Sequence, residues 1–191
     1  FMAASVYKVG LSMYTYYLVN NGSISLDDLV YYDGSDFEDG AGILQSEDYI
    51  GGRSVQDLLD LSIIHSDNIA SNMLWRYLGG YYNFKDGLYS LIEADCDVTE
   101  NVITPDMEFR ILKYRYDNKD DHNFSHLIET MKQTTSHDRI DKYLPDGKVA
   151  HTIGDYDSYS HDVGIVFAYS PFILVVCTDC VENSYEKTAQ I

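Results

Sequence analysis

The chain has 191 residues, of which 45% are hydrophobic and 14% aromatic, and its formal net charge is −18 at pH 7. This length and apolar content exclude a disordered chain and suffice for one hydrophobic core, and no run of about 18 apolar residues is present that could span a bilayer. The negative charge repels phosphate backbones and anionic lipids, so nucleic acids and membrane surfaces are poor partners.

The first two thirds of the sequence predict mainly helices. Apolar residues recur at helical spacing over residues 3–21, and Asn20-Asn21-Gly22 is an end signal. The Asp-, Gly- and Ser-rich stretch 23–52 predicts loops with brief turns. Helical patterns with N-caps such as Ser54 and Thr104 predict further helices over residues 55–65, 68–78, 84–93, 105–116 and 122–133.

The last third predicts strands. After Pro145-Asp146-Gly147, β-branched and aromatic runs at 148–156, 161–169 and 172–177 alternate with turn residues, which is typical of a three-stranded antiparallel meander. Residues 182–191 predict the first turns of a closing helix. The pair Cys177 and Cys180 has redox or metal spacing, but it ends a strand and does not open a helix, so we interpret it as structural.

A serine and a lysine one helical turn apart open the chain, in Ser5-Val6-Tyr7-Lys8. A serine hydroxyl is a weak nucleophile until a base removes its proton, and residues i and i+3 share one face of a helix. Partial burial would lower the pKa of Lys8 and make its neutral form available as that base. Because S-x-x-K is common by chance, the pair alone does not establish a catalytic site.

Two further motifs follow in order. Ser66-Asp67-Asn68 lies at a polar break after an apolar helix stripe, where it could face a cleft or simply cap the next helix. His151-Thr152-Ile153-Gly154 lies on the first predicted strand, where a cation followed by a hydroxyl could hold a substrate carboxylate, although a His-Thr pair in a strand is usually structural. Only the combination of the three motifs is informative.

S-x-x-K, S-D-N and K-T-G together are the signature of class A β-lactamases and penicillin-binding proteins. On these motifs, on Thr104-Pro105 and on residues 149–166, the chain resembles class A β-lactamases over nearly its whole length. The resemblance implies an α+β, β-lactamase/transpeptidase-like fold for residues 1–191 as a single catalytic domain. A helical lobe (10–140) would pack on an antiparallel sheet lobe (145–191), with the nucleophile helix at the interface.

The resemblance also implies catalytic roles. Ser5 would be acylated by the β-lactam carbonyl, Lys8 would act as base or proton relay, and Ser66 would pass a proton to the leaving nitrogen. The oxyanion hole would consist of the backbone N–H groups of Ser5 and Gly154. No cofactor and no metal are expected.

Substrate binding by resemblance would use Asn68 for the substrate side-chain amide, and His151 and Thr152 for its carboxylate. The usual lysine is replaced by His151, which would make carboxylate binding weaken as pH rises near neutrality. Ile153 replaces the usual glycine, and its branched side chain could narrow the slot for the substrate. This departure makes binding of unmodified penicillins doubtful.

The segment 94–104 is shorter than the corresponding loop of class A enzymes, whose E-x-x-L-N motif supplies the glutamate that activates the deacylating water. No such motif occurs, and Glu100-Asn101 is the only acid and amide pair near the expected place. Loss of a general base commonly costs about 10²–10⁴-fold in rate. We therefore expect an acyl-enzyme that forms and is released slowly.

The leading hypothesis is a serine hydrolase of β-lactamase type acting on a β-lactam or a cell-wall peptide amide. The alternative is a catalytically impaired binding or sensor domain that keeps the fold.

His122, His126 and His137 suggest a metal site only weakly, because no carboxylate or cysteine completes it. The resemblance implies an extracellular or cell-envelope protein. The family sheet has five strands, two of them before the nucleophile helix, and only three are predicted here. We therefore expect either that a partner chain covers the strand at 172–177, as in self-association through the sheet edge, or that the sequence is part of a longer protein.

Overall fold

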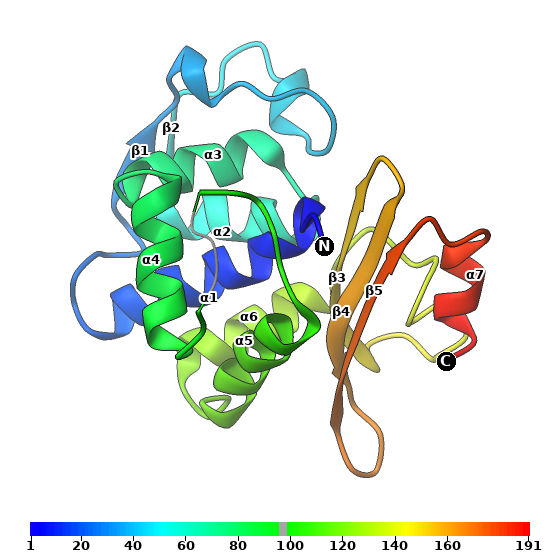
Figure 1. The fold of residues 1–191 in the computed structure, drawn as a ribbon. Coiled ribbons are helices and arrows are strands. Elements are labelled where there is room, and N and C mark those ends of the chain that lie inside the picture. Colours follow the sequence, from blue (N-terminus) through cyan, green and yellow to red (C-terminus); the bar gives the residue numbers. More distant parts are fainter. Residues whose placement is uncertain (96–98) are drawn as a thin grey trace.

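In the computed structural model, which describes residues 1–95 and 99–191, a group of helices lies beside an antiparallel sheet (Figure 1). Helix α1 (Tyr7–Asn20) runs through the middle of the helical group and packs against the helices around it. These are α2 (Val55–Ile64), α3 (Asn68–Tyr77), α4 (Tyr81–Leu91), α5 (Pro105–Asp117) and α6 (His122–Met131). No helix in the described ranges is long and apolar enough to cross a bilayer.

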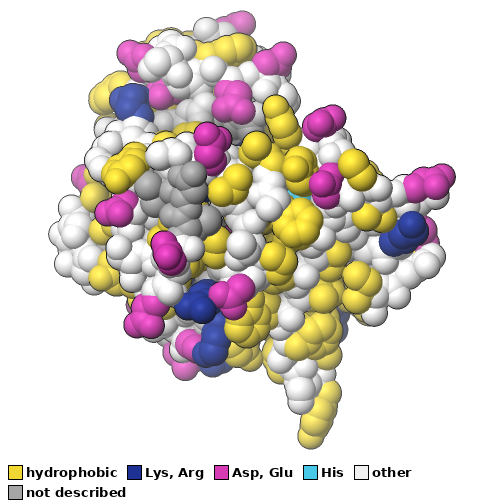
Figure 2. Space-filling model, in the orientation of Figure 1, with side chains coloured by type: hydrophobic (Ala, Val, Ile, Leu, Met, Phe, Trp, Pro, Cys, Tyr) yellow, Lys and Arg dark blue, Asp and Glu magenta, His cyan; other side chains and the backbone are white. Residues whose placement is uncertain are grey.

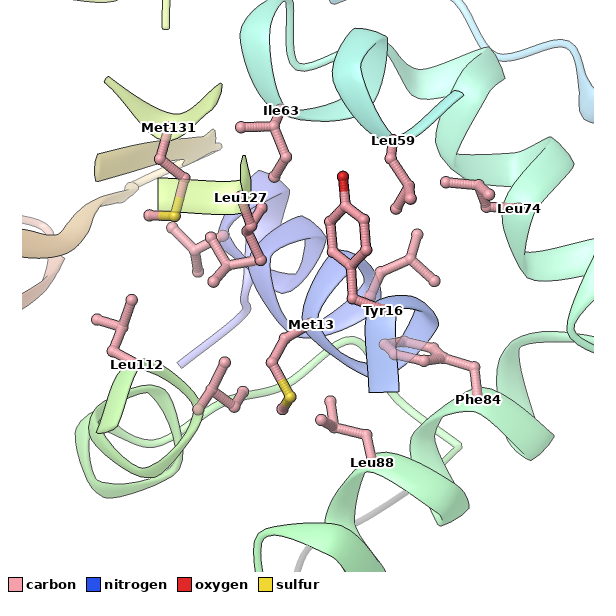
Figure 3. Close-up of a cluster of buried hydrophobic side chains, with 14 of the residues drawn as sticks. Met13, Tyr16, Leu59, Ile63, Leu74, Phe84, Leu88, Leu112, Leu127 and Met131 are labelled. Atoms are coloured by element: carbon pink, nitrogen blue, oxygen red, sulfur yellow. The ribbon is translucent and has the colours of Figure 1, made fainter. Parts of the chain in front are cut away.

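The core of the helical group is built around the buried side chains of α1. Figure 3 shows Met13 and Tyr16 of this helix among apolar side chains from the helices around it, including Leu59, Ile63, Leu74, Phe84, Leu88, Leu112, Leu127 and Met131. Full burial of one such side chain is worth roughly 1.5–3 kcal/mol. The helix that follows Ser5 and carries Lys8 is therefore held from several sides.

The main sheet has the order β3-β4-β5 and is antiparallel throughout. Its strands are β3 (Val149–Tyr156), β4 (Tyr159–Val166) and β5 (Phe172–Asp179). Strand β3 contacts the short 3-10 turn η1 (Ala4–Val6) that precedes α1, so the sheet meets the helical group at the start of the chain. Helix α7 (Ser184–Ala189) lies on the side of the sheet away from the other helices (Figure 1).

Strand β5 is an outer strand, and most of its residues are only partly buried. Hydrophobic side chains gather over the sheet on the face drawn in Figure 2, while Asp and Glu side chains are spread over much of the rest of that face. Self-association through this edge stays a prediction. Within the described residues, Cys177 and Cys180 at the end of β5 are free thiols, and Cys96 lies outside those residues.

The α+β fold, the helices and the meander predicted from the sequence are confirmed, with helix ends within a few residues of the expected ones. The stretch 23–52 was expected to contain only loops and turns, but it holds strand β1 (Leu29–Tyr31) and the first residue of strand β2 (Gly52–Ser54), which pair antiparallel. Two short 3-10 turns, η2 (Gly34–Asp36) and η3 (Leu44–Ser46), lie between them. Strands of three residues are too short to show a period-2 pattern.

Candidate active site

Ser5 lies in the 3-10 turn η1, directly before α1, and Lys8 lies in the first turn of that helix. Lys8 Nζ is 3.2 Å from Ser5 Oγ, within hydrogen-bond distance. The residue before the serine, Ala4, has a φ of 47°, a left-handed conformation that is costly for a residue with a Cβ. The buried Ala3 and Val6 anchor this turn, so the hydroxyl is fixed next to the amine.

Lys8 also contacts the S-D-N motif. Its Nζ donates to the Ser66 carbonyl oxygen at 2.5 Å, to Ser66 Oγ at 3.0 Å and to Asn68 Oδ1 at 2.8 Å. Ser66 has a φ of 51°, which turns the chain sharply between α2 and α3. One buried amine thus joins the hydroxyls of Ser5 and Ser66 and the amide of Asn68, as the three-motif interpretation requires.

Burial raises the neutral fraction of Lys8. It lowers the pKa of Lys8 from 10.5 to about 8, and the negative charges of Glu38 and Asp67 partly oppose this effect. The side chain is 1% exposed, which accounts for the desolvation. With a pKa of about 8, roughly a tenth of Lys8 is neutral at pH 7, and this fraction rises with pH.

Asp67 is the structural member of the S-D-N motif. Its carboxylate caps α3 by accepting from Ala70 N at 2.9 Å, and it also accepts from Ile43 N at 2.7 Å and Leu44 N at 2.8 Å. The side chain is fully buried. A single carboxylate thus fixes both the start of α3 and the loop that contains Ile43 and Leu44. It thereby positions Ser66 and Asn68, the residues on either side of Asp67 in the chain.

Strand β3 supplies a wall of the pocket that contains Ser5. This pocket, of about 200 Å³, is lined by Ser66, Thr152 and Gly154, among other residues. A Cβ built on Gly154 would come within 3.0 Å of the Ser5 amide nitrogen, so glycine permits the strand to approach the nucleophile turn. Thr152 Oγ1 is buried and has no hydrogen-bond partner among the described residues.

His151 takes a different position. It does not line the Ser5 pocket, and its ring is 1% exposed. Its Nδ1 lies 2.9 Å from Asp162 Oδ1, and its Nε2 lies 3.2 Å from Asp141 Oδ2. Burial alone would lower the pKa of His151, but the two carboxylates outweigh it and raise the pKa to about 9. The structure brings Thr152 and Gly154 to the pocket, and direct substrate binding by His151 stays a prediction.

The whole chain, residues 1–191, matches the profile of the Beta-lactamase enzyme family. The chain belongs to this family. No curated protein sequence gives a significant match.

Solved structures with the same fold include a β-lactamase from Sphaerobacter thermophilus, with 22% identity and a TM-score of 0.84 over 100% of this chain and 79% of that one. The protein PBP-A is similar at 19% identity, with a TM-score of 0.85 over 100% of this chain and 78% of its own. A β-lactamase from Chitinophaga pinensis has 21% identity and a TM-score of 0.82, covering 99% and 81% of the two chains. These likenesses show a β-lactamase fold.

Arg139 is a buried cation of this β-lactamase-family chain that contacts the Ser5 pocket through Asp155 and that the sequence does not predict. Arg139 is 1% exposed, donates from Nη1 to the His161 carbonyl oxygen at 2.7 Å and pairs through Nη2 with Asp155, which lines the Ser5 pocket. Its guanidinium stacks on Tyr185 at 3.9 Å from the ring centroid. Arg139 lies in an irregular segment without helical or strand periodicity. Its burial and its contacts therefore cannot be predicted from the sequence and are seen only in the tertiary structure.

A second pocket shares Ser5 and is lined by the acidic residues Glu38 and Asp39 and by Asn101, among others. Glu38 accepts from Asn72 Nδ2 at 2.9 Å, and Asn101 Nδ2 donates to the Ala4 carbonyl oxygen at 3.4 Å. Glu100, the acid of the Glu100-Asn101 pair near the place of the missing glutamate, is exposed. Across the described ranges, no carboxylate hydrogen-bonds Ser5 or Lys8.

Proposed function

We propose that this chain is a β-lactamase-like serine hydrolase that is acylated at Ser5 by a β-lactam or a cell-wall peptide amide. The observation that supports it most strongly is the position of the Lys8 amine, 3.2 Å from Ser5 Oγ and 3.0 Å from Ser66 Oγ. A serine, its base and a second hydroxyl for the leaving group are then within one proton-transfer chain.

In the proposed reaction, neutral Lys8 accepts the proton of Ser5 Oγ while this oxygen attacks the substrate carbonyl carbon. The N–H groups of Ser5 and Gly154 stabilise the oxyanion, a contribution commonly worth about 3 kcal/mol for one donor. The carbon–nitrogen bond then breaks, and the Lys8 proton passes through Ser66 Oγ to the leaving nitrogen. Thr152 lines the pocket, and its buried Oγ1, which has no partner in the described chain, would turn to bind the substrate carboxylate.

Release of the acyl group is proposed to be slow. The sequence has no E-x-x-L-N motif, and Glu38 and Asp155 line the pockets around Ser5 without a hydrogen bond to Ser5 or Lys8. Water that attacks the ester would then lack a positioned base. A cell-envelope location, which the family resemblance implies, belongs to the same proposal, because cell-wall peptides are found there.

The second candidate is a binding or sensor domain with impaired catalysis. Ile153 lines the Ser5 pocket at the position where the K-T-G motif has glycine. A branched side chain there restricts how closely a substrate backbone can approach β3. This candidate predicts ligand binding without a covalent intermediate.

Stopped-flow kinetics with a chromogenic cephalosporin distinguishes the two candidates. The hydrolase proposal predicts a burst of about one equivalent of product per chain, followed by slow turnover, and loss of the burst in Ser5→Ala. Binding without any burst would favour the sensor domain. Fast steady turnover that Ser5→Ala abolishes would support acylation but contradict slow release.

A further inference from the structure

A cluster of histidine and carboxylate side chains lies outside the Ser5 pocket, between the segment after α6 and strand β3. It consists of His137, Asp141 and His151, and one ligand atom from each lies within 4.8 Å of the others. Asp141 Oδ2 contacts His137 Nδ1 and is 3.2 Å from His151 Nε2. The sequence suggested His137 only together with His122 and His126, but His126 instead contacts Asp60 and Gln56.

The orientation of His151 suits a metal ligand. Its Nδ1 faces Asp162 Oδ1 at 2.9 Å, and the other oxygen of this fully buried carboxylate accepts from Ile140 N at 2.9 Å. A carboxylate that accepts from one ring nitrogen fixes the proton there, so a metal would replace only the proton that the other nitrogen shares with Asp141. Asp162 would thus orient His151 from behind, with Nε2 directed toward Asp141.

One buried oxygen of the cluster lacks a partner. In the described part of the chain, Asp141 Oδ1 makes no hydrogen bond, and the contact of His151 Nε2 is the ion pair with Asp141 Oδ2 at 3.2 Å. Buried polar atoms without partners are uncommon in folded proteins and are often explained by a bound ion or water.

The cluster is also reachable from solvent. The side chain of His137 is 60% exposed, and a pocket of about 440 Å³ is lined by His137 and Asp141. Lys132 and Lys142 line the same pocket, but they form ion pairs with Glu129 and Glu186. With Asp162 included, the cluster carries two carboxylates, which favours a cation.

We propose that His137, Asp141 and His151 bind a Zn²⁺ ion, with a fourth position open to water. Two imidazole nitrogens and one carboxylate oxygen are a ligand set that zinc accepts, and bond lengths of about 2.0–2.1 Å in a tetrahedron imply ligands about 3.3 Å apart. The 3.2 Å between Asp141 and His151 agrees with this spacing, whereas His137 lies closer to Asp141 and would move away from it to admit the ion. The ion would join the segment that contains Thr134, Thr135 and Ser136, which lines the Ser5 pocket, to strand β3.

Calorimetric titration of the chelator-treated full chain with ZnCl₂ tests the proposal. We expect one ion per chain and, with Co²⁺ as a probe, the visible absorption of a tetrahedral site. His137→Ala should weaken binding at least 10-fold, because it removes an exposed ligand without disturbing the core. His122→Ala is the matched control, since this exposed histidine on α6 is outside the cluster, and it should leave the affinity unchanged.

Asp162→Asn gives a second test, because it should weaken binding about 10–100-fold while leaving all three ligands in place. Circular dichroism would verify that each variant is folded. The proposal is overturned if Zn²⁺ does not bind saturably, or if His137→Ala and His122→Ala bind the ion equally well. Since the test measures ion binding and not acylation, its result is independent of the proposed hydrolase function.

Discussion

Lys8 is the side chain that links the parts of the candidate active site, because its amine contacts Ser5, Ser66 and Asn68 at once. The pairing of Ser5 with Lys8 could be predicted from their spacing, since residues three apart share a helix face. The approach of Ser66 could be predicted only from family resemblance. Glu38, whose charge opposes the fall in the Lys8 pKa, could not be predicted, because it comes from an irregular loop without a motif.

We predict that Glu38→Gln moves the pH dependence of acylation to lower pH. Acylation needs neutral Lys8, so its rate should rise as pH increases through the Lys8 pKa of about 8. Removing the negative charge of Glu38 removes an effect that raises this pKa, so the midpoint should fall by a few tenths of a pH unit. Rates of acylation by a reporter β-lactam between pH 6 and 9 measure it. The exposed Glu182→Gln is the control, and an unchanged or higher midpoint in Glu38→Gln would refute the assignment.

Among the elements, the start of α3 is the one that positions Ser66 and Asn68 against Lys8. Interpreted from sequence, S-D-N was either a helix cap or a catalytic motif, and the structure shows that Asp67 is the cap while Ser66 and Asn68 contact Lys8. The helices were predictable because apolar periodicity and caps are local signals. The hairpin of β1 and β2 was not, because its pairing depends on residues far apart in sequence.

We predict that Asp67→Ala lowers the free energy of unfolding by roughly 2–4 kcal/mol, because three backbone N–H groups, two of them in buried hydrogen bonds, lose their acceptor. Asp121→Ala removes an N-cap of α6 at an exposed site and should cost only about 1 kcal/mol. Urea unfolding of both variants measures the difference. Equal losses would mean that the loop contacts of Asp67 add nothing to its role as a cap.

At the scale of the whole molecule, the helical group meets the sheet around a buried acid. Glu108 on α5 is fully buried, and its two carboxylate oxygens have no hydrogen-bond partner within the described residues. Burial raises its pKa from 4.5 to about 8, although the charge of Lys85 opposes the shift. Such an acid binds its proton more tightly in the folded than in the unfolded chain, so its contribution to stability is lost as pH rises from 4.5 to about 8.

We predict that Glu108→Gln has nearly the stability of the parent chain at pH 5 but exceeds it by roughly 2–4 kcal/mol at pH 8. Glutamine has nearly the shape of the protonated acid and the same neutral charge. The free energies of unfolding of the two proteins should therefore differ only at pH values where Glu108 is ionised in the unfolded chain. Denaturant unfolding at both pH values checks this. A difference that is the same at pH 5 and pH 8 would show that the ionisation of Glu108 is not responsible.

Covalent labelling of Ser5 tests the central claim most directly. After incubation with a penicillin, intact-mass spectrometry should show one adduct per chain, and peptide mapping should assign it to the segment that contains Ser5. Ser5→Ala should form no adduct, and Lys8→Met should form it far more slowly. A folded chain that gives no adduct, or an adduct that persists in Ser5→Ala, would contradict the proposal that β-lactams acylate Ser5.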